Sequence, residues 1–176
     1  MLKTQNCGEL RPTHSGQQVT LAGWVNRRRD QGGLIFIDLR DRWGIVQVLV
    51  NQEDAPEAHR IASEARNEYV LQVNGLVRIR PEGTANPELE TGEVEVVAAS
   101  IKILNTAKTP PFYINKDEKI EEITRMQYRY LDLRRPRMQE NIVLRHRIVT
   151  SFNAEADGVD TLEIIRRILE MVKERS

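Results

Sequence analysis

The amino-acid sequence predicts a mainly β fold, a closed barrel of five strands with one helix inserted between the third and the fourth strand. Hydrophobic and polar residues alternate along five short segments, which is the two-residue period of a half-buried strand. One segment between them instead carries small and aliphatic residues three to four positions apart, the period of a helix. With 176 residues, the chain has room for one well-buried domain of about 100 to 150 residues and an appendage.

The first three strands are predicted over residues 18–26, 34–40 and 45–50. Glycine-containing turns at residues 31–33 and 41–44 separate them, because glycine adopts the backbone conformations that tight turns need. In each strand one face is aliphatic and is expected to point into the barrel. The residues assigned to that face are Val19, Leu21, Gly23, Val25, Ile35, Ile37, Leu39, Val46, Val48 and Val50.

A helix of about a dozen residues is predicted to follow, since Asp54 and Pro56 are typical of a helix start. Its inward residues are Ala58, Ile61, Ala62 and Ala65. Two more strands are expected, at residues 69–80 and around residues 94–98. Their inward residues are Leu71, Val73, Gly75, Val77, Ile79, Val94, Val96 and Ala98.

The order of three strands, a helix and two strands is that of the OB-fold, a Greek-key barrel. In this fold, strands two and three and the loops beside them bind oligonucleotides. Residues 1–105 are therefore predicted to be an OB-fold domain. Another small antiparallel barrel is the alternative.

The chain beyond this barrel is expected to be a linker and a helical tail. Residues 106–136 include Thr109-Pro110-Pro111-Phe112, a stiff extended connection. Residues 137–176 form the tail, with one element running from Pro136 to about Phe152 and an amphipathic helix at residues 160–174.

The amino-acid composition excludes some classes of function but does not identify one. The 26 Lys and Arg residues balance the 26 Asp and Glu residues, so a nucleic-acid surface has to come from local clusters such as Arg27-Arg28-Arg29. The single cysteine, Cys7, has no disulfide partner and no histidines near it for a zinc site. Since no signal peptide and no membrane-length apolar run are visible, we expect a cytoplasmic protein.

Phe36 and Gln47 are the first candidate binding residues, because both are predicted to project from the non-core side of strands two and three. An aromatic ring in that position suits stacking on an unpaired base, and an amide offers a donor and an acceptor to a base edge. The alternative for Phe36 is packing under a loop.

Cations are expected around the same face at Arg29, Arg78 and Arg80, where they would meet phosphates and purine edges. Glu95, on the neighbouring strand, could accept hydrogen bonds from guanine. A cross-strand ion pair with one of the arginines is the alternative. Motifs of catalysis and of metal binding, such as HExxH, GxSxG or a Gly-rich phosphate loop, are absent from the sequence.

Six runs of residues form a distinctive set along the chain. They are Gly23-Trp24-Val25-Asn26-Arg27-Arg28-Arg29-Asp30, Gly33-Leu34-Ile35-Phe36-Ile37-Asp38-Leu39-Arg40-Asp41, Gly44-Ile45-Val46-Gln47-Val48, Thr91-Gly92-Glu93-Val94-Glu95-Val96, Lys108-Thr109-Pro110-Pro111-Phe112 and Tyr128-Arg129-Tyr130-Leu131-Asp132-Leu133-Arg134-Arg135-Pro136. These runs resemble the anticodon-binding region of bacterial aspartyl-tRNA synthetases. The resemblance covers about residues 1 to 150, and the last run is especially specific.

The resemblance implies a role for each candidate. Phe36 would stack on the central anticodon uridine, Gln47 would read the edge of that base, and Glu95 would read the wobble guanine or its modified form. The residues implied to hold the rest of the loop are Arg29, Arg78, Arg80 and Asn86. The implied partner is tRNA-Asp, with tRNA-Asn as a second candidate. A homodimer is implied for the full-length family, but most of the family's dimer surface is missing from this chain, so its oligomeric state is left open.

The resemblance ends within the tail. In the family, the run Arg145-His146-Arg147-Ile148-Val149 opens the long helix of class II motif 1, but residues 151–158 depart from that pattern and the proline of the motif does not follow. Motifs 2 and 3, which hold ATP, are also missing. The chain is therefore expected to lack aspartate–tRNA ligase activity and to use no cofactor, while ATP and Mg²⁺ would serve the missing catalytic domain.

The origin of such a chain has several explanations: a gene fragment, a frameshift, a fusion or a freestanding paralogue. Two other functions are also open. One is a sequence-tolerant single-strand binder, and the other is a protein-interaction module without RNA binding.

Overall fold

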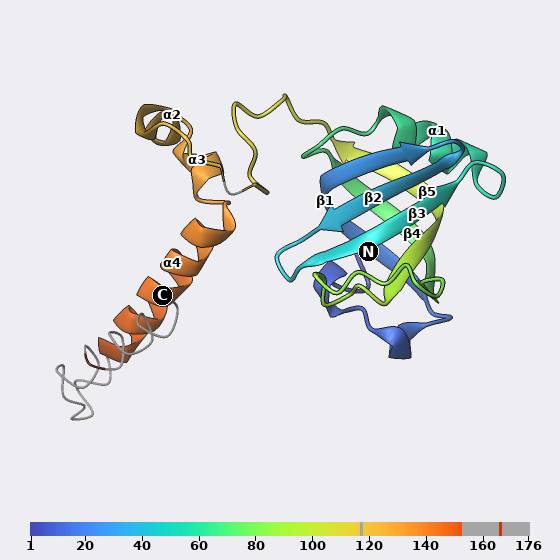
Figure 1. The fold of residues 1–176 in the computed structure, drawn as a ribbon, viewed down its shortest axis with the longest axis horizontal. Helices are drawn as coiled ribbons and strands as arrows, with labels where there is room; N and C mark the ends of the chain where they lie inside the picture. The colour runs from blue at the N-terminus through green and yellow to red at the C-terminus, as the bar shows by residue number, and fades with distance from the viewer. Residues whose placement is uncertain (117, 153–165, 167–176) are drawn as a thin grey trace. The chain divides into compact units, whose positions relative to one another are not determined.

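The computed structural model describes residues 1–116, 118–152 and 166 of the chain (Figure 1). Two compact units are present, Met1–Pro111 and Phe112–Ser176. None of the helices in the described residues combines the length and the hydrophobicity that a membrane crossing requires.

The first unit is a closed five-stranded barrel, as predicted. Its strands are β1 (Gln18–Gln31), β2 (Leu34–Arg40), β3 (Ile45–Asn51), β4 (Val70–Ile79) and β5 (Val94–Asn105). They follow one another around the barrel in the order β1-β2-β3-β5-β4. Only the β3–β5 pair of this barrel is parallel, and together with the β1–β4 pair it joins the first three strands to the last two. The helix α1 (Pro56–Glu64) lies between β3 and β4 in the chain, where the sequence predicts it.

The barrel core follows the predicted alternation closely. The inward residues of all five strands and the small side chains of α1 form one buried hydrophobic cluster. At Gly75 on β4 only a glycine fits, because the β5 backbone at Val97 lies where a Cβ atom would be. The β4–β5 register shifts between Asn74 and Gly75, so this close approach accompanies an irregularity in the strand pairing.

Three predicted boundaries and one burial assignment are wrong. β1 continues past residue 26 to Gln31, because its polar end pairs with β2 in a hairpin whose turn residues Gly32 and Gly33 both have positive φ. The helix has nine residues rather than about twelve, and β5 runs on to Asn105. Ile79, predicted to face the core, is 55% exposed, since it ends β4 at the rim of the barrel.

The segment before β1 contains two short 3-10 helices, Cys7–Glu9 and Pro12–His14. It is fastened to the β2–β3 turn, because the Cys7 N–H donates to Asp41 Oδ2 at 2.9 Å and Lys3 pairs with the same carboxylate at 3.1 Å. Burial raises the pKa of the Cys7 thiol well above its ordinary value. Cys7 is therefore a packed structural residue.

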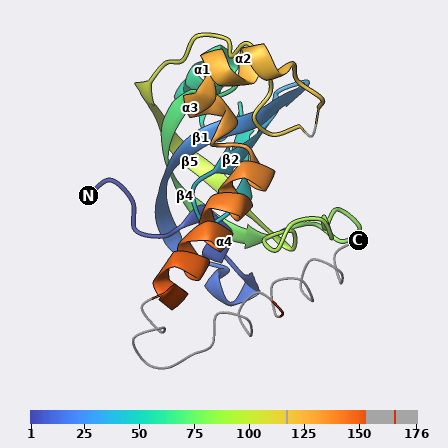
Figure 2. The ribbon, with the colours of Figure 1, turned by 90° about the vertical axis from the view of Figure 1, so that its left-hand side faces the viewer.

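The described part of the second unit contains three helices, labelled in Figure 2: α2 (Glu122–Gln127), α3 (Arg129–Asp132) and α4 (Pro136–Phe152). α4 begins and ends at the predicted residues. A small cluster of Phe112, Ile114 and Leu131 is the hydrophobic core of this unit's described part. The amphipathic helix predicted at residues 160–174 lies outside the described residues.

Asp132 is a second anchor of this unit. Its carboxylate is fully buried and pairs with Arg125 and Arg129, both at 2.9 Å. The hydrogen bond from Arg125 lowers the pKa of Asp132, and the charges of Arg129 and Arg135 act in the same direction. The arginine-rich run that ends at Arg135 therefore owes part of its local structure to one carboxylate.

Candidate nucleic-acid interface

A cavity of about 450 Å³ opens on the barrel face formed by β1, β2 and β3, with β4, β5 and the loop between those two strands as its further walls. Its lining residues are Arg27, Arg29, Gln31, Leu34, Phe36, Asp38, Gln47, Leu49, Arg78, Arg80, Pro81, Thr84, Asn86, Leu89 and Glu95. All seven residues singled out from the sequence are among them. The fold thus gathers in one place side chains that lie far apart in the sequence, from Arg29 to Glu95.

Strand register explains how these side chains meet. On neighbouring strands, Arg29 lies opposite Phe36, and Gln47 lies opposite both Asp38 and Glu95. Arg78 lies opposite Glu95 on the remaining side. Residues directly opposite each other on adjacent strands have Cβ atoms only about 5 Å apart, so their side chains interact.

Phe36 stands on the wall of the cavity and outside the hydrophobic core cluster. Its ring is half-buried, and the guanidinium carbon of Arg29 lies 5.7 Å from the ring centroid. A cation at this distance is attracted by the face of the ring. The aromatic surface at this position is therefore next to a positive charge, an arrangement suited to a base and its phosphate.

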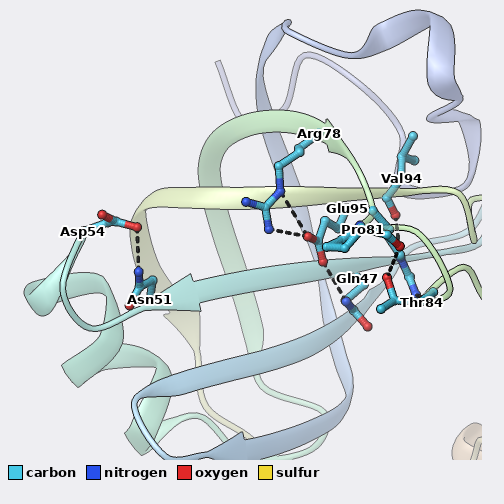
Figure 3. Close-up of polar contacts among 9 residues, drawn as sticks. Gln47, Asn51, Asp54, Arg78, Pro81, Thr84, Val94 and Glu95 are labelled. Carbon is cyan, nitrogen blue, oxygen red and sulfur yellow. Dashed lines mark hydrogen bonds and ion pairs between the residues drawn. The ribbon is translucent and has the colours of Figure 1, made fainter.

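Gln47 is fixed by hydrogen bonds at both ends of its amide. Its Nε2 atom donates to Glu95 Oε2 at 2.9 Å, and its Oε1 atom accepts from Arg29 Nη2 at 3.0 Å. Arg78 binds the other oxygen of Glu95 through Nε at 3.2 Å and Nη2 at 2.6 Å. Figure 3 shows Gln47, Arg78 and Glu95 pointing toward one another from three strands.

The burial of Gln47 and Glu95 differs from the sequence-based expectation. The alternation predicts that both face outward, but both are buried, with exposed fractions of 7% and 3%, because they satisfy each other within the cavity wall. The cross-strand ion pair considered as an alternative role for Glu95 does form, with Arg78.

Arg80 follows the last residue of β4, one position beyond the strand. Its Nε atom donates to the Val94 carbonyl at 3.0 Å, while its Nη2 atom is buried without a hydrogen-bond partner among the described residues. Burial lowers the pKa of this guanidinium, although an arginine stays charged at neutral pH. A buried donor without a partner costs free energy, so a ligand that places an acceptor at Arg80 Nη2 would remove this cost.

Asn86 belongs to the loop between β4 and β5. Its Oδ1 atom accepts from the Glu88 N–H at 3.0 Å, and its backbone N–H donates to the Gly92 carbonyl at 3.0 Å. The Thr91 hydroxyl donates to the Ile45 carbonyl and ties the end of the loop to β3. Asn86 is thus placed at the rim of the cavity by the folding of its own loop.

Asp38 is a member of the site that the sequence interpretation missed. Asp38 Oδ1 accepts from Arg29 Nη2 at 3.0 Å, and the two groups form an ion pair. The signal was available, since Asp38 shares the outward face of β2 with Phe36. The cavity wall as a whole carries four arginines and two carboxylates, a positive excess that suits a polyanion.

A barrel of this topology with a cationic cavity on β1, β2 and β3 defines the class of OB-fold nucleic-acid-binding domains. The sequence agrees, because residues 19–104 match the OB-fold nucleic acid binding domain family of the tRNA anti-codon type. Homologous proteins then identify the particular family.

An aspartate–tRNA(Asp/Asn) ligase from Moorella thermoacetica is 59% identical over 162 residues, which are 92% of this chain and 27% of that protein. A ligase of the same name from Dehalococcoides mccartyi strain CBDB1 is 56% identical over 96% of this chain and 28% of its own length. The chain belongs to the aspartyl-tRNA synthetase family and carries the family's anticodon-binding OB-fold domain. It spans little more than a quarter of the length of these relatives.

Solved structures show the same similarity in three dimensions. The asparaginyl-tRNA synthetase of Pyrococcus horikoshii, in a complex with asparaginyl-adenylate, superposes with a TM-score of 0.74 at 25% identity, over 90% of this chain and 35% of that one. The OBody AM2EP06, bound to hen egg-white lysozyme, superposes with a TM-score of 0.52 at 28% identity, over 60% of this chain and 95% of that one.

Proposed function

We propose that the cavity binds the anticodon loop of tRNA-Asp. The observation that carries the proposal is that Phe36, Gln47 and Glu95 line one cavity, so that a stacking surface and two edge-reading groups are within reach of neighbouring bases. The names of the relatives, which are ligases acting on tRNA-Asp and tRNA-Asn, support a tRNA as the ligand.

Each group suits one base of the anticodon. Stacking on Phe36 would contribute roughly 1 to 3 kcal/mol for the central uridine. The amide of Gln47 can donate to a carbonyl oxygen of that uridine and accept from its N3–H. Glu95 can accept from the N1–H and the amino group of guanine, a pattern that no other standard base offers in the same way.

The cationic wall would serve the RNA backbone and the third base. Arg29 and Arg78 are partly exposed at the cavity and can reach phosphates. Arg80 offers a buried donor that has no partner among the described residues, and Asn86 stands at the rim of the same cavity. These groups would hold the loop while Phe36, Gln47 and Glu95 distinguish bases.

tRNA-Asn is a second proposed ligand, because the relatives' names include both tRNAs. By the genetic code, the two anticodons share guanine and uracil at the first and second positions and differ at the third. A cavity that reads the shared pair through Glu95 and Gln47 would accept both tRNAs. Discrimination would then depend on the contacts made by Arg80 and Asn86.

A gel-shift experiment separates this proposal from its rivals. The chain should shift tRNA-Asp and tRNA-Asn at concentrations that leave an unrelated tRNA and poly-U unshifted, and Phe36→Ala should abolish the difference. Trp43→Ala is the matched control, since Trp43 is a 53% exposed aromatic residue of the same barrel that does not line the cavity. Equal shifts of every RNA would indicate a sequence-tolerant binder, and no shift at all would indicate a protein-interaction module.

We also propose that aminoacylation, with ATP and Mg²⁺, depends on the part of the relatives that this chain does not match. The chain incubated with aspartate, ATP, Mg²⁺ and tRNA-Asp should then form no aspartyl-tRNA. Accumulation of aspartyl-tRNA in this reaction would contradict the proposal. The contribution of the OB-fold domain would be to position the tRNA.

A further inference from the structure

Asp38 is a carboxylate in a cavity proposed to bind a polyanion. It lies on β2, opposite Gln47 on β3, and its side chain is only 16% exposed. A negative charge at this place repels phosphate groups, so the residue weakens RNA binding unless it contributes something that offsets the repulsion. Its contacts show what that contribution is.

The contacts form a chain from Asp38 to the base-reading amide. Arg29 Nη2 donates to Asp38 Oδ1 at 3.0 Å and to Gln47 Oε1 at 3.0 Å. An Nη atom carries two hydrogens, so these two bonds use both of them. The carboxylate of Asp38 takes one hydrogen and thereby directs the other toward Gln47.

This arrangement fixes the orientation of the Gln47 amide. Its oxygen faces a guanidinium, which only donates, and its nitrogen faces the Glu95 carboxylate, which only accepts. A flipped amide would place an NH₂ group against Arg29 and an oxygen against Glu95, and both hydrogen bonds would be lost. The network therefore leaves a single orientation.

Orientation matters because uracil and cytosine present opposite hydrogen-bonding patterns. Uracil has a donor at N3 and an acceptor at O4, while cytosine has an acceptor at N3 and a donor at N4. An amide held in one orientation matches only one of these patterns, and the flipped amide matches the other. A glutamine that is free to flip would tell the two bases apart poorly.

We propose that Asp38 is a positioning residue for specificity: through Arg29 it holds the Gln47 amide in the orientation that selects uracil over cytosine at the middle anticodon base. This inference rests on the proposed function. Asp38 itself does not need to touch the RNA. Loss of Asp38 frees Arg29 Nη2 to turn away from Gln47, so that only the bond from Gln47 Nε2 to Glu95 still opposes the flip of the amide.

The test measures dissociation constants of the full chain for an anticodon stem-loop RNA with U or C at the middle position, at one salt concentration. The wild-type chain should favour the U form. Asp38→Ala should reduce the U/C preference about tenfold, the size of one base-edge contact, without weakening binding of the C form. Asp38→Asn, which keeps an oxygen that accepts from Arg29, should restore most of the preference.

Two controls separate positioning from charge and from folding. Asp30→Ala removes a nearby carboxylate that does not line the cavity, so it should leave the U/C preference unchanged. Thermal unfolding checks each variant, and Asp38→Ser replaces Asp38→Ala if the alanine variant does not unfold cooperatively. The double variant Asp38→Ala/Gln47→Ala should show the same preference as Gln47→Ala alone, because Asp38 acts through Gln47.

The inference would be overturned if Asp38→Ala kept the U/C preference within about twofold of the wild-type value. It would also be overturned if the two substitutions reduced the preference independently, so that their reductions multiplied in the double variant. These outcomes leave the proposed function standing if Gln47→Ala still lowers the preference. A wild-type chain that binds neither stem-loop would overturn both the inference and the proposed function.

Discussion

The Arg78 Nη2 atom lies 2.6 Å from Glu95 Oε1, and the two side chains differ widely in exposure, at 47% and 3%. Glu95 also accepts from Gln47, so three of its roughly four lone-pair sites are occupied. A guanine edge that needs two acceptors at Glu95 would therefore have to displace an N–H of Arg78. The exposed side chain of Arg78 can move toward a phosphate, whereas Glu95 cannot leave the wall.

Arg78→Ala should lower the free energy of unfolding by about 1 to 3 kcal/mol, because the buried Glu95 carboxylate loses two hydrogen bonds. Urea unfolding of the chain measures the change. Arg60→Ala is the control, since Arg60 pairs with exposed carboxylates on α1 and should have little effect. Equal losses for the two variants would show that Glu95 does not depend on Arg78.

Phe36→Ala should weaken tRNA-Asp binding by about 1 to 3 kcal/mol through the loss of a stacking surface. Phe36→Tyr keeps the ring and should retain most of the affinity. Fluorescence anisotropy at fixed salt measures both. Because Phe36 is outside the buried core cluster, the melting temperature should change little. An unchanged dissociation constant for Phe36→Ala would remove this residue from the interface.

How far the sequence predicts this structure depends on how local each feature is. The alternation of residues 34–40 places Phe36 on the face opposite Ile35 and Ile37, and the structure confirms it. The burial of Glu95 and Gln47 could not be predicted, because their cover comes from each other and from Arg29, on different strands.

Other features depend on pairing that no local pattern reveals. The end of β1 is polar on both faces and becomes a strand only because it pairs with β2. No local pattern in the sequence predicts the burial of Asp132, the last residue of α3, which the fold places against arginines that come before and after it in the chain. A carboxylate that is surrounded by several arginines in this way depends on the folded backbone, which brings these side chains together.

Gln47→Ala should relax discrimination at the middle anticodon base. The variant loses the edge-reading amide, so RNAs with U and with C at that position should bind with nearly equal affinity, while unrelated changes in the stem should matter as before. Competition binding with the two stem-loops measures the ratio. Equal weakening for every middle base would mean that Gln47 supports the cavity wall without reading an edge.

Asp132 should make the second unit sensitive to acid. Arg125 lowers the pKa of this carboxyl, so its folded value lies below its unfolded value. The stabilisation is therefore fully present above the unfolded pKa and is lost as the pH falls through the folded pKa. The protection factors of the Leu131 and Leu133 amides, which compare the observed hydrogen exchange with the intrinsic rate at the same pH, should fall in that acidic range.

Asp132→Asn cannot ionise, so its protection factors should already be low at neutral pH and should lose this pH dependence. Glu118→Gln, which alters an exposed carboxylate, should behave as wild type. High protection factors in Asp132→Asn at neutral pH would show that the surrounding arginines do not need this charge to hold α3 in place.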